Sequence, residues 1–113
     1  MLPKQNRLNT EELQGVLKSG LNIHSTLLSF KYKPVLGSTT SKFSFVVSNK
    51  VSKSSPKRNL LKRRGRNVLY KQILKIKKGF WGVFFFKPNS PKANFKQIED
   101  DILYLLKKAG LLN

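Results

Sequence analysis

Six basic residues and no acidic one fall within the ten residues from Lys57 to Arg66, KRNLLKRRGR. Lysine and arginine donate charge-assisted hydrogen bonds, and the planar guanidinium of arginine matches the oxygens of a phosphate. A helix that served only solubility would mix both charge signs for i,i+4 pairing, and this run does not. The segment therefore indicates a phosphate-binding surface more than a catalytic centre.

Acid–base and metal chemistry have few candidate residues in this chain. His24 is the only histidine, cysteine is absent, and the five acidic residues are Glu11, Glu12, Glu99, Asp100 and Asp101. We place these carboxylates in the first turns of helices, where acids favour the helix dipole. We expect no catalytic residue, no metal ligand and no bound cofactor in the protein itself. The absence of cysteine also fits a cytoplasmic location.

A helix from Lys57 to about Lys77 would position the basic residues. Because an α-helix turns by about 100° per residue, it would sort the side chains of this segment onto two different arcs of its surface. The arc that we expect to pack on a sheet contains Leu61, Gly65, Val68, Leu69 and Ile76. The other arc contains Asn59, Lys62, Arg63, Arg66 and Tyr70, with Arg58 at its edge. Tyr70 could stack on RNA or merely shield the helix, and the pattern leaves both open.

The remaining elements follow from periodicity and capping residues. Helices are predicted after Asn9 and after Asn94, because Glu12 and Gln97 stand three residues on, as in a capping box. Strands are predicted over residues 25–33, 43–48 and 80–87, with one more short strand possible near Lys50. The order α-β-β-(β)-α-β-α predicts an α/β fold, an α+β sandwich with a mixed four-stranded sheet.

Charge and length limit the class of protein. The 113 residues carry a net charge of +18, and 39% are hydrophobic, so we expect one domain over residues 1–113. Self-repulsion of that size is relieved by a polyanion, and nucleic acid is the leading candidate. The longest apolar run, Phe80–Phe86, is far shorter than a membrane span, and the N-terminus has no signal-peptide core.

The segment RNLLKRRGR, from Arg58 to Arg66, resembles the RNRxKRxxR signature of the protein subunit of bacterial ribonuclease P. The similarity extends to PKQNRLNTEEL near the N-terminus, to FSFVVSNKV before the signature and to NFKQIEDDILYLLKKAGLL at the C-terminus. Nearly the whole chain is covered, in the family's order and spacing. The resemblance implies a sheet with helices on one face, a partly open cleft and a left-handed βαβ crossover.

The resemblance also implies a function and its residues. The chain would bind the catalytic ribonuclease P RNA and the 5′ leader of precursor tRNA, and Mg²⁺ on the RNA would carry out the cleavage that makes the complex an endoribonuclease (EC 3.1.26.5). The RNA-binding positions would be Lys50, Lys53, Arg58, Asn59, Lys62, Arg63 and Arg66. The leader cleft would be formed by Leu13, Leu17, Leu28, Phe30 and Val46. A membrane or DNA partner is not expected.

Four positions depart from the family pattern. Leu60 replaces an arginine of the signature, Leu13 and Leu17 stand where phenylalanine is usual, and Trp81 replaces an acidic residue at the start of the last strand.

Two other functions would also explain a basic chain of this size. The alternatives are a small basic ribosomal protein or RNA chaperone and a membrane-surface protein. Membrane binding would need a wide exposed apolar face on a basic helix, whereas the apolar arcs here are needed for the core.

Overall fold

The structure is a computed structural model that describes residues 2–38 and 40–113. Its helices are α1 (Thr10–Ser19), α2 (Ser55–Gln72) and α3 (Phe95–Lys108), with short 3₁₀ turns η1 (Lys4–Asn6) and η2 (Ser90–Lys92). Its strands are β1 (Leu21–His24), β2 (Leu28–Pro34), β3 (Lys42–Val46) and β4 (Phe80–Phe86). None of the helices in these two ranges is long and apolar enough to cross a membrane.

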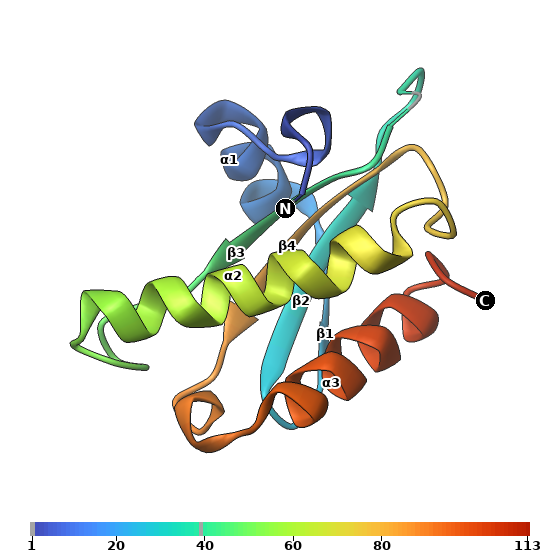
Figure 1. Ribbon diagram of the computed structural model, residues 1–113. Coiled ribbons are helices and arrows are strands. Elements are labelled where there is room, and N and C mark those ends of the chain that lie inside the picture. The colour runs from blue at the N-terminus through green and yellow to red at the C-terminus, as the bar shows by residue number, and fades with distance from the viewer. Residues whose placement is uncertain (1, 39) are drawn as a thin grey trace.

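The four strands form one mixed sheet in the order β1-β2-β4-β3. β1 pairs with β2, and β2 with β4, in antiparallel fashion, whereas β3 and β4 are parallel. α2 connects these two parallel strands and lies in front of the sheet in Figure 1. Viewed from the α2 side with β3 and β4 pointing up, the chain moves leftward from β3 to β4, so the crossover is left-handed, as the resemblance implies.

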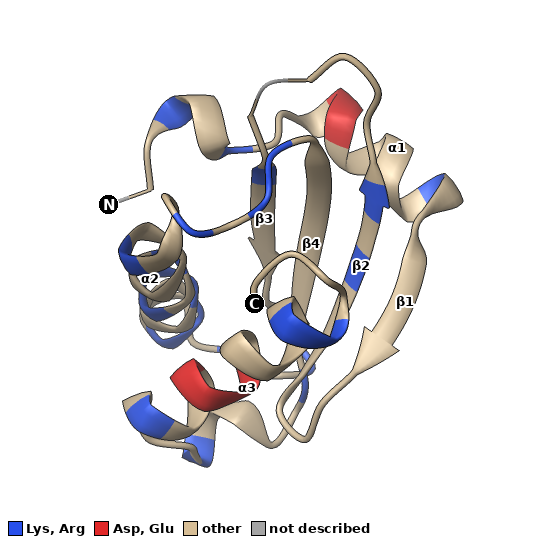
Figure 2. Ribbon diagram, turned by 90° about the vertical axis from the view of Figure 1, so that its right-hand side faces the viewer, with Lys and Arg blue, Asp and Glu red and all other residues tan. Residues whose placement is uncertain are grey.

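Two helices cover one face of the sheet and the third helix lies on the other face, as Figure 2 shows. We call the face under α2 and α3 the helix-covered face, and the face that α1 partly covers the open face. The main hydrophobic core lies on the helix-covered face, where the Phe84 ring stacks on Phe30 and Phe45 with centroids 4.2 and 5.0 Å apart. Gly65 of α2 sits directly on the Phe45 ring, so this helix approaches the sheet closely.

The helix starts form as the capping residues predict. Asn9 and Glu12 exchange hydrogen bonds at the start of α1, and Asn94 and Gln97 do so at the start of α3. Such reciprocal pairs satisfy amide groups that have no partner inside the helix. Both predicted capping boxes are therefore confirmed.

Three predicted element boundaries are wrong. Lys50 lies in a turn, and the fourth strand is instead β1. The chain turns between residues 24 and 28 because Ser25 N–H donates to the Leu28 carbonyl at 2.8 Å, which divides the predicted strand 25–33 from β1. The α2 helix stops at Gln72 and not near residue 77. Ile76 is nevertheless buried, through the turn that follows the helix.

Candidate nucleic-acid interface

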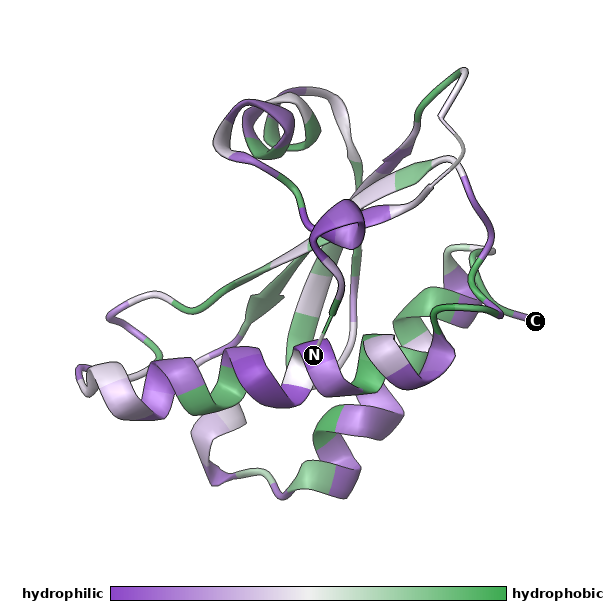
Figure 3. Cartoon of the chain, turned by 45° about the horizontal axis from the view of Figure 1, so that its top comes forward, coloured by the Kyte–Doolittle hydropathy of each residue, from purple (hydrophilic) through white to green (hydrophobic). Residues whose placement is uncertain are grey.

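The sequence-predicted arcs of α2 are confirmed by burial. Leu61, Gly65, Val68 and Leu69 are buried on the sheet, and the basic residues of the helix lie at the surface. Figure 3 shows that hydrophilic and hydrophobic residues alternate along α2. Asn59 and Arg63 are exposed, while Arg58, Lys62 and Arg66 are half-buried. α2 therefore presents a row of donors on a rigid element.

The basic charges of α2 have no carboxylate partner among the described residues. The two ion pairs found there join Lys42 to Glu12 and Lys96 to Asp100, and neither involves α2. No acidic residue occupies the first turn of α2, so the positive end of its helix dipole adds to the side-chain charge. An incoming anion would therefore meet side chains that need not first break an ion pair.

Arg58 also has a structural role at the start of α2. Its guanidinium donates to the Ser52 carbonyl oxygen at 2.9 Å and to Ser55 Oγ at 2.8 Å. These bonds fix the segment that leads into the helix, where Lys50 and Lys53 are both exposed. The structure thus brings the two lead-in lysines to the end of α2 from which the basic arc begins.

Two neighbouring hollows continue from α2 across the β3 edge. The first, of about 110 Å³, is lined by Arg66 together with Arg7, Phe43 and Phe45 among others. The second, of about 370 Å³, shares Arg7 and also has Lys4 and Lys42 in its lining. Arg7, Lys4 and Lys42 therefore extend the basic surface toward α1. The sequence analysis missed these residues because they are isolated charges rather than a cluster.

The structure buries two residues of the predicted leader cleft, Leu28 and Phe30, so they cannot line a surface cleft. Both side chains are fully buried on the helix-covered face, where Phe30 stacks between Tyr32 and Phe84. The five residues predicted for the cleft therefore do not share one surface, because α1, which carries Leu13 and Leu17, lies on the opposite face of the sheet. Phe30 has no exposed ring face on which a base could stack.

The open face carries a different aromatic residue. Val46 pairs with Phe85 across β3 and β4, and Phe85 pairs with Ser29 across β4 and β2. All three side chains are half-buried, as are Leu13 and Leu17 of α1. Because side chains alternate along a strand, Phe85 of β4 points to the other face of the sheet from Phe84 and Phe86. This alternation is the sequence signal that could have identified Phe85 as a residue of the open face. The continuous apolar run concealed that alternation.

Glu12 has a partner at each carboxylate oxygen. Oε1 accepts from the Asn9 backbone N–H at 2.9 Å, and Oε2 accepts from Lys42 Nζ at 2.7 Å. Burial would raise the pKa of Glu12, but these hydrogen bonds and the attraction to Lys42 together lower the pKa below its ordinary value of 4.5. Glu12 therefore remains ionised and joins α1 to β3 at neutral pH.

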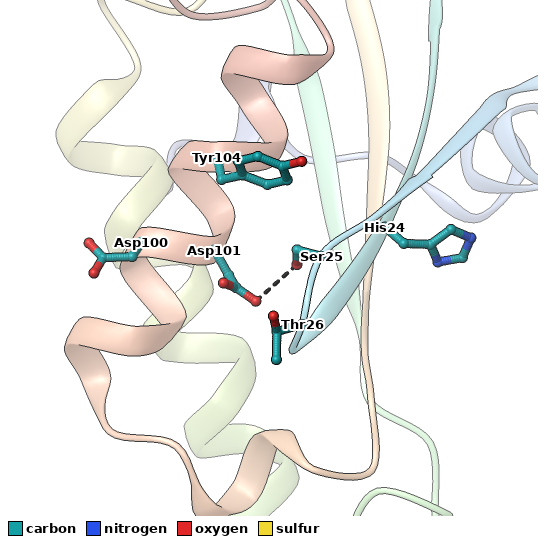
Figure 4. A pocket seen from close by; sticks show the side chains of 6 residues that line it. All are labelled: His24, Ser25, Thr26, Asp100, Asp101 and Tyr104. Carbon is teal, nitrogen blue, oxygen red and sulfur yellow. Dashed lines mark hydrogen bonds between the residues drawn. The ribbon is translucent and has the colours of Figure 1, made fainter.

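Another hollow, of about 590 Å³, lies beside the β1–β2 turn and is drawn in Figure 4. Asp101 Oδ2 accepts from Ser25 Oγ at 2.9 Å and from the Leu27 backbone N–H at 2.6 Å. His24 points away from this carboxylate. The Asp101 side chain thus anchors the turn to α3, and the histidine does not join it in an acid–base pair.

Comparison with known sequences identifies close counterparts over the whole chain. The family model described as Ribonuclease P matches residues 2–110. The ribonuclease P protein component of Pseudanabaena sp. is 33% identical over 114 residues, which cover 100% of this chain and 98% of that protein. The ribonuclease P protein component of Microcystis aeruginosa is 29% identical over 116 residues, which cover 99% of this chain and 97% of that protein.

Solved structures share the fold at lower identity. The Staphylococcus aureus RNase P protein has a TM-score of 0.87 and 17% identity, with 96% of this chain and 98% of that chain covered. The Thermotoga maritima RNase P protein has a TM-score of 0.81 and 23% identity, with coverages of 90% and 96%. The arrangement of helices and strands is therefore that of known bacterial RNase P proteins.

Proposed function

This chain belongs to the ribonuclease P protein family, and from that membership we propose that it binds the catalytic RNA of ribonuclease P and assists removal of the 5′ leader from precursor tRNA. The observation that carries the proposal is the basic arc of α2, whose arginines and lysines have no ion-pair partner in the described residues. Phosphates spaced along a structured RNA reward such donors by releasing condensed counterions.

The two faces of the molecule would have separate roles. The lead-in lysines and the arc formed by Arg58, Asn59, Lys62, Arg63 and Arg66 would contact the catalytic RNA. The open face, with Phe85, Val46 and the exposed sides of Leu13 and Leu17, would contact the unpaired leader. Stacking on an aromatic ring holds single-stranded RNA with little sequence preference, which suits leaders of differing sequence.

We assign the cleavage itself to the RNA and its bound Mg²⁺, which can activate water and stabilise the leaving oxygen. In support, most carboxylates of the chain already have structural partners: Glu12 bonds to Asn9 and Lys42, Asp101 to Ser25 and Leu27, and Asp100 to Lys96. The protein would then neutralise phosphates and help distinguish precursor from mature tRNA. A cytoplasmic location, where bacterial tRNA is transcribed, belongs to the same proposal.

The experiment measures leader cleavage by the cognate RNA at low Mg²⁺ in three parallel reactions. One contains the wild-type chain, one the double variant Arg63→Ala/Arg66→Ala, and one the control double variant Lys92→Ala/Lys107→Ala. The control pair removes the same charge from exposed positions outside α2. We expect wild type and control to stimulate cleavage. The α2 variant should bind the RNA more weakly, with a salt slope lower by about 0.9 for each lost phosphate contact.

Two results would contradict the proposal. Cleavage by the protein without RNA would place the active site in the chain. Equal affinity and equal salt slope for the two double variants would remove α2 from the RNA interface. RNA binding without stimulation of cleavage would instead support an RNA chaperone or a ribosomal protein.

A further inference from the structure

The outer edge of β1 has none of the usual protection of a sheet edge. The strand order β1-β2-β4-β3 gives β1 a partner on one side only among the described residues, and Figure 2 shows it as the outermost strand. Its sequence, LNIH, contains no lysine, arginine or acidic residue, and Leu21 is 64% exposed. Natural sheets protect a free edge with charged side chains, proline or a covering segment. The β1 edge is therefore open to another strand.

The opposite edge of the sheet, formed by β3, is protected. Arg7 forms an isolated parallel bridge with Phe43, and the Leu8 backbone N–H donates to the Phe43 carbonyl oxygen at 3.1 Å. Lys42 and Arg66 line the hollows that also contain Arg7, so they add positive charge there. A strand approaching β3 would meet this covering segment and its charges. β1 is thus the edge at which the sheet can be extended.

The hydrogen bonds of the sheet indicate which backbone groups of β1 are directed outward. The Ser25 N–H donates to the Leu28 carbonyl oxygen at 2.8 Å, so these two residues form a hydrogen-bonded pair. Such pairs alternate with non-bonded pairs along an antiparallel ladder. The register of β1 on β2 therefore places Asn22 and His24 in non-bonded positions. Their backbone N–H and C=O groups point away from β2, toward the free edge.

The spacing of these two residues makes the edge self-complementary. When a second β1 strand pairs antiparallel about a two-fold axis at Ile23, Asn22 of each copy lies opposite His24 of the other, and their outward groups can exchange hydrogen bonds. Ile23 lies opposite itself, on the helix-covered face, where it packs against the core. We propose that a second copy of this chain docks on β1 in this register, so that the two sheets join into one.

The distribution of charge also favours this edge over the rest of the surface. α2, which carries the basic arc, packs on β3 at the other side of the sheet. Asp100 and Asp101 lie beside the β1–β2 turn and offset positive charge near the join. Repulsion between two chains of net charge +18 opposes the dimer at low salt, and added salt screens it. Both basic arcs stay free in the dimer, so this inference goes beyond the proposed function and does not depend on it.

The test of the register uses the full chain, which contains no cysteine, with one introduced thiol. In the proposed dimer the two copies of residue 23 are directly opposite, as a disulfide requires, whereas the two copies of residue 21 are about 13 Å apart along the strand. With oxidised glutathione at high salt, we expect Ile23→Cys to form covalent dimers roughly tenfold faster than Leu21→Cys. Leu21 is exposed and Ile23 is half-buried, so random collisions would give the reverse order.

Sedimentation at high salt tests the same edge without a new covalent bond. We expect a dimer fraction that rises with the concentration of wild-type chain. Asn22→Lys places two positive charges at the join and should abolish the dimer. Asn67→Lys adds the same charge at an exposed position on α2 and should leave the dimer unchanged.

Three results would each overturn the proposal. They are a wild-type chain that stays monomeric at every concentration, faster cross-linking of Leu21→Cys than of Ile23→Cys, and equal dimer fractions for Asn22→Lys and Asn67→Lys. Thermal melting shows whether each variant is folded. Because residue 22 is exposed, the lysine pair decides the question even when Ile23→Cys does not fold.

Discussion

At the scale of single residues, the face of the sheet on which an aromatic side chain lies decides whether that side chain can contact a ligand. Phe30 and Phe85 are both phenylalanines on central strands, yet the first is fully buried under helices and the second is half-buried on the open face. Only the second has surface to offer a ligand. We therefore propose Phe85, and not Phe30, as the aromatic residue of the open face that contacts the leader.

Phe85→Ala should weaken binding of precursor tRNA to the ribonucleoprotein more than binding of mature tRNA, because only the precursor carries a leader. Removing one base-stacking aromatic costs about 1–3 kcal/mol, which is roughly fivefold or more in affinity. Equilibrium binding to both RNAs measures the difference. Tyr104→Ala, which removes an aromatic that is 50% exposed on α3, is the control. Equal losses for precursor and mature tRNA would refute the role of Phe85.

At the scale of elements, residue patterns predicted the helices better than the sheet. The capping residues Asn9 and Asn94 act within one turn, so the sequence near each contains all the information needed. The face and neighbours of a strand depend on segments far away. Alternation separates Phe30 from Lys31, but it does not reveal which of these faces the two large helices will cover.

The same reasoning explains the errors in the candidate site. The arc of α2 was predicted correctly because its buried side is set by local helical periodicity. The cleft positions on β2, Leu28 and Phe30, were predicted incorrectly. The reason is that β4 is apolar on both faces and pairs with β2 and β3 from distant parts of the chain. Arg7 and Lys42 approach the basic surface only through the fold.

The attachment of α1 should weaken in acid. The pKa of Glu12 is lower in the folded state than its ordinary value of 4.5. Its contribution to stability is therefore complete above about pH 4.5 and is lost as the pH falls through the folded-state pKa. Hydrogen exchange in α1 should accelerate relative to α3 below that pH. Glu12→Gln should abolish this pH dependence, and an unchanged dependence in that variant would assign it to another group.

At the scale of the whole molecule, charge is the dominant feature. The net charge of +18 is carried by 23 lysine and arginine residues against five acidic ones. Figure 2 shows much of that charge along α2, a helix that contains no acidic residue. Mutual repulsion among these groups opposes the compact state until an anion is bound. The free protein should therefore be less stable than the protein in its complex.

Single-stranded RNA should raise the melting temperature of the chain. At a free RNA concentration one hundred times the Kd, binding to the folded state adds about 2.7 kcal/mol of stability, which corresponds to roughly 10 °C for a domain of this size. Calorimetry with oligouridine measures the shift, and an uncharged polymer at equal mass concentration is the control. Equal shifts with both polymers would mean that crowding, and not phosphate binding, stabilises the fold.

The place of β4 between β2 and β3 has a consequence for how the protein is made. The two earlier strands do not pair with each other, and each depends on Phe80–Phe86 for its inner neighbour. During translation the β1–β2 hairpin can form early, but the sheet closes only after most of the chain has left the ribosome. Distant pairing of this kind slows folding. For most of its synthesis the nascent chain is therefore an incomplete sheet with a growing positive charge.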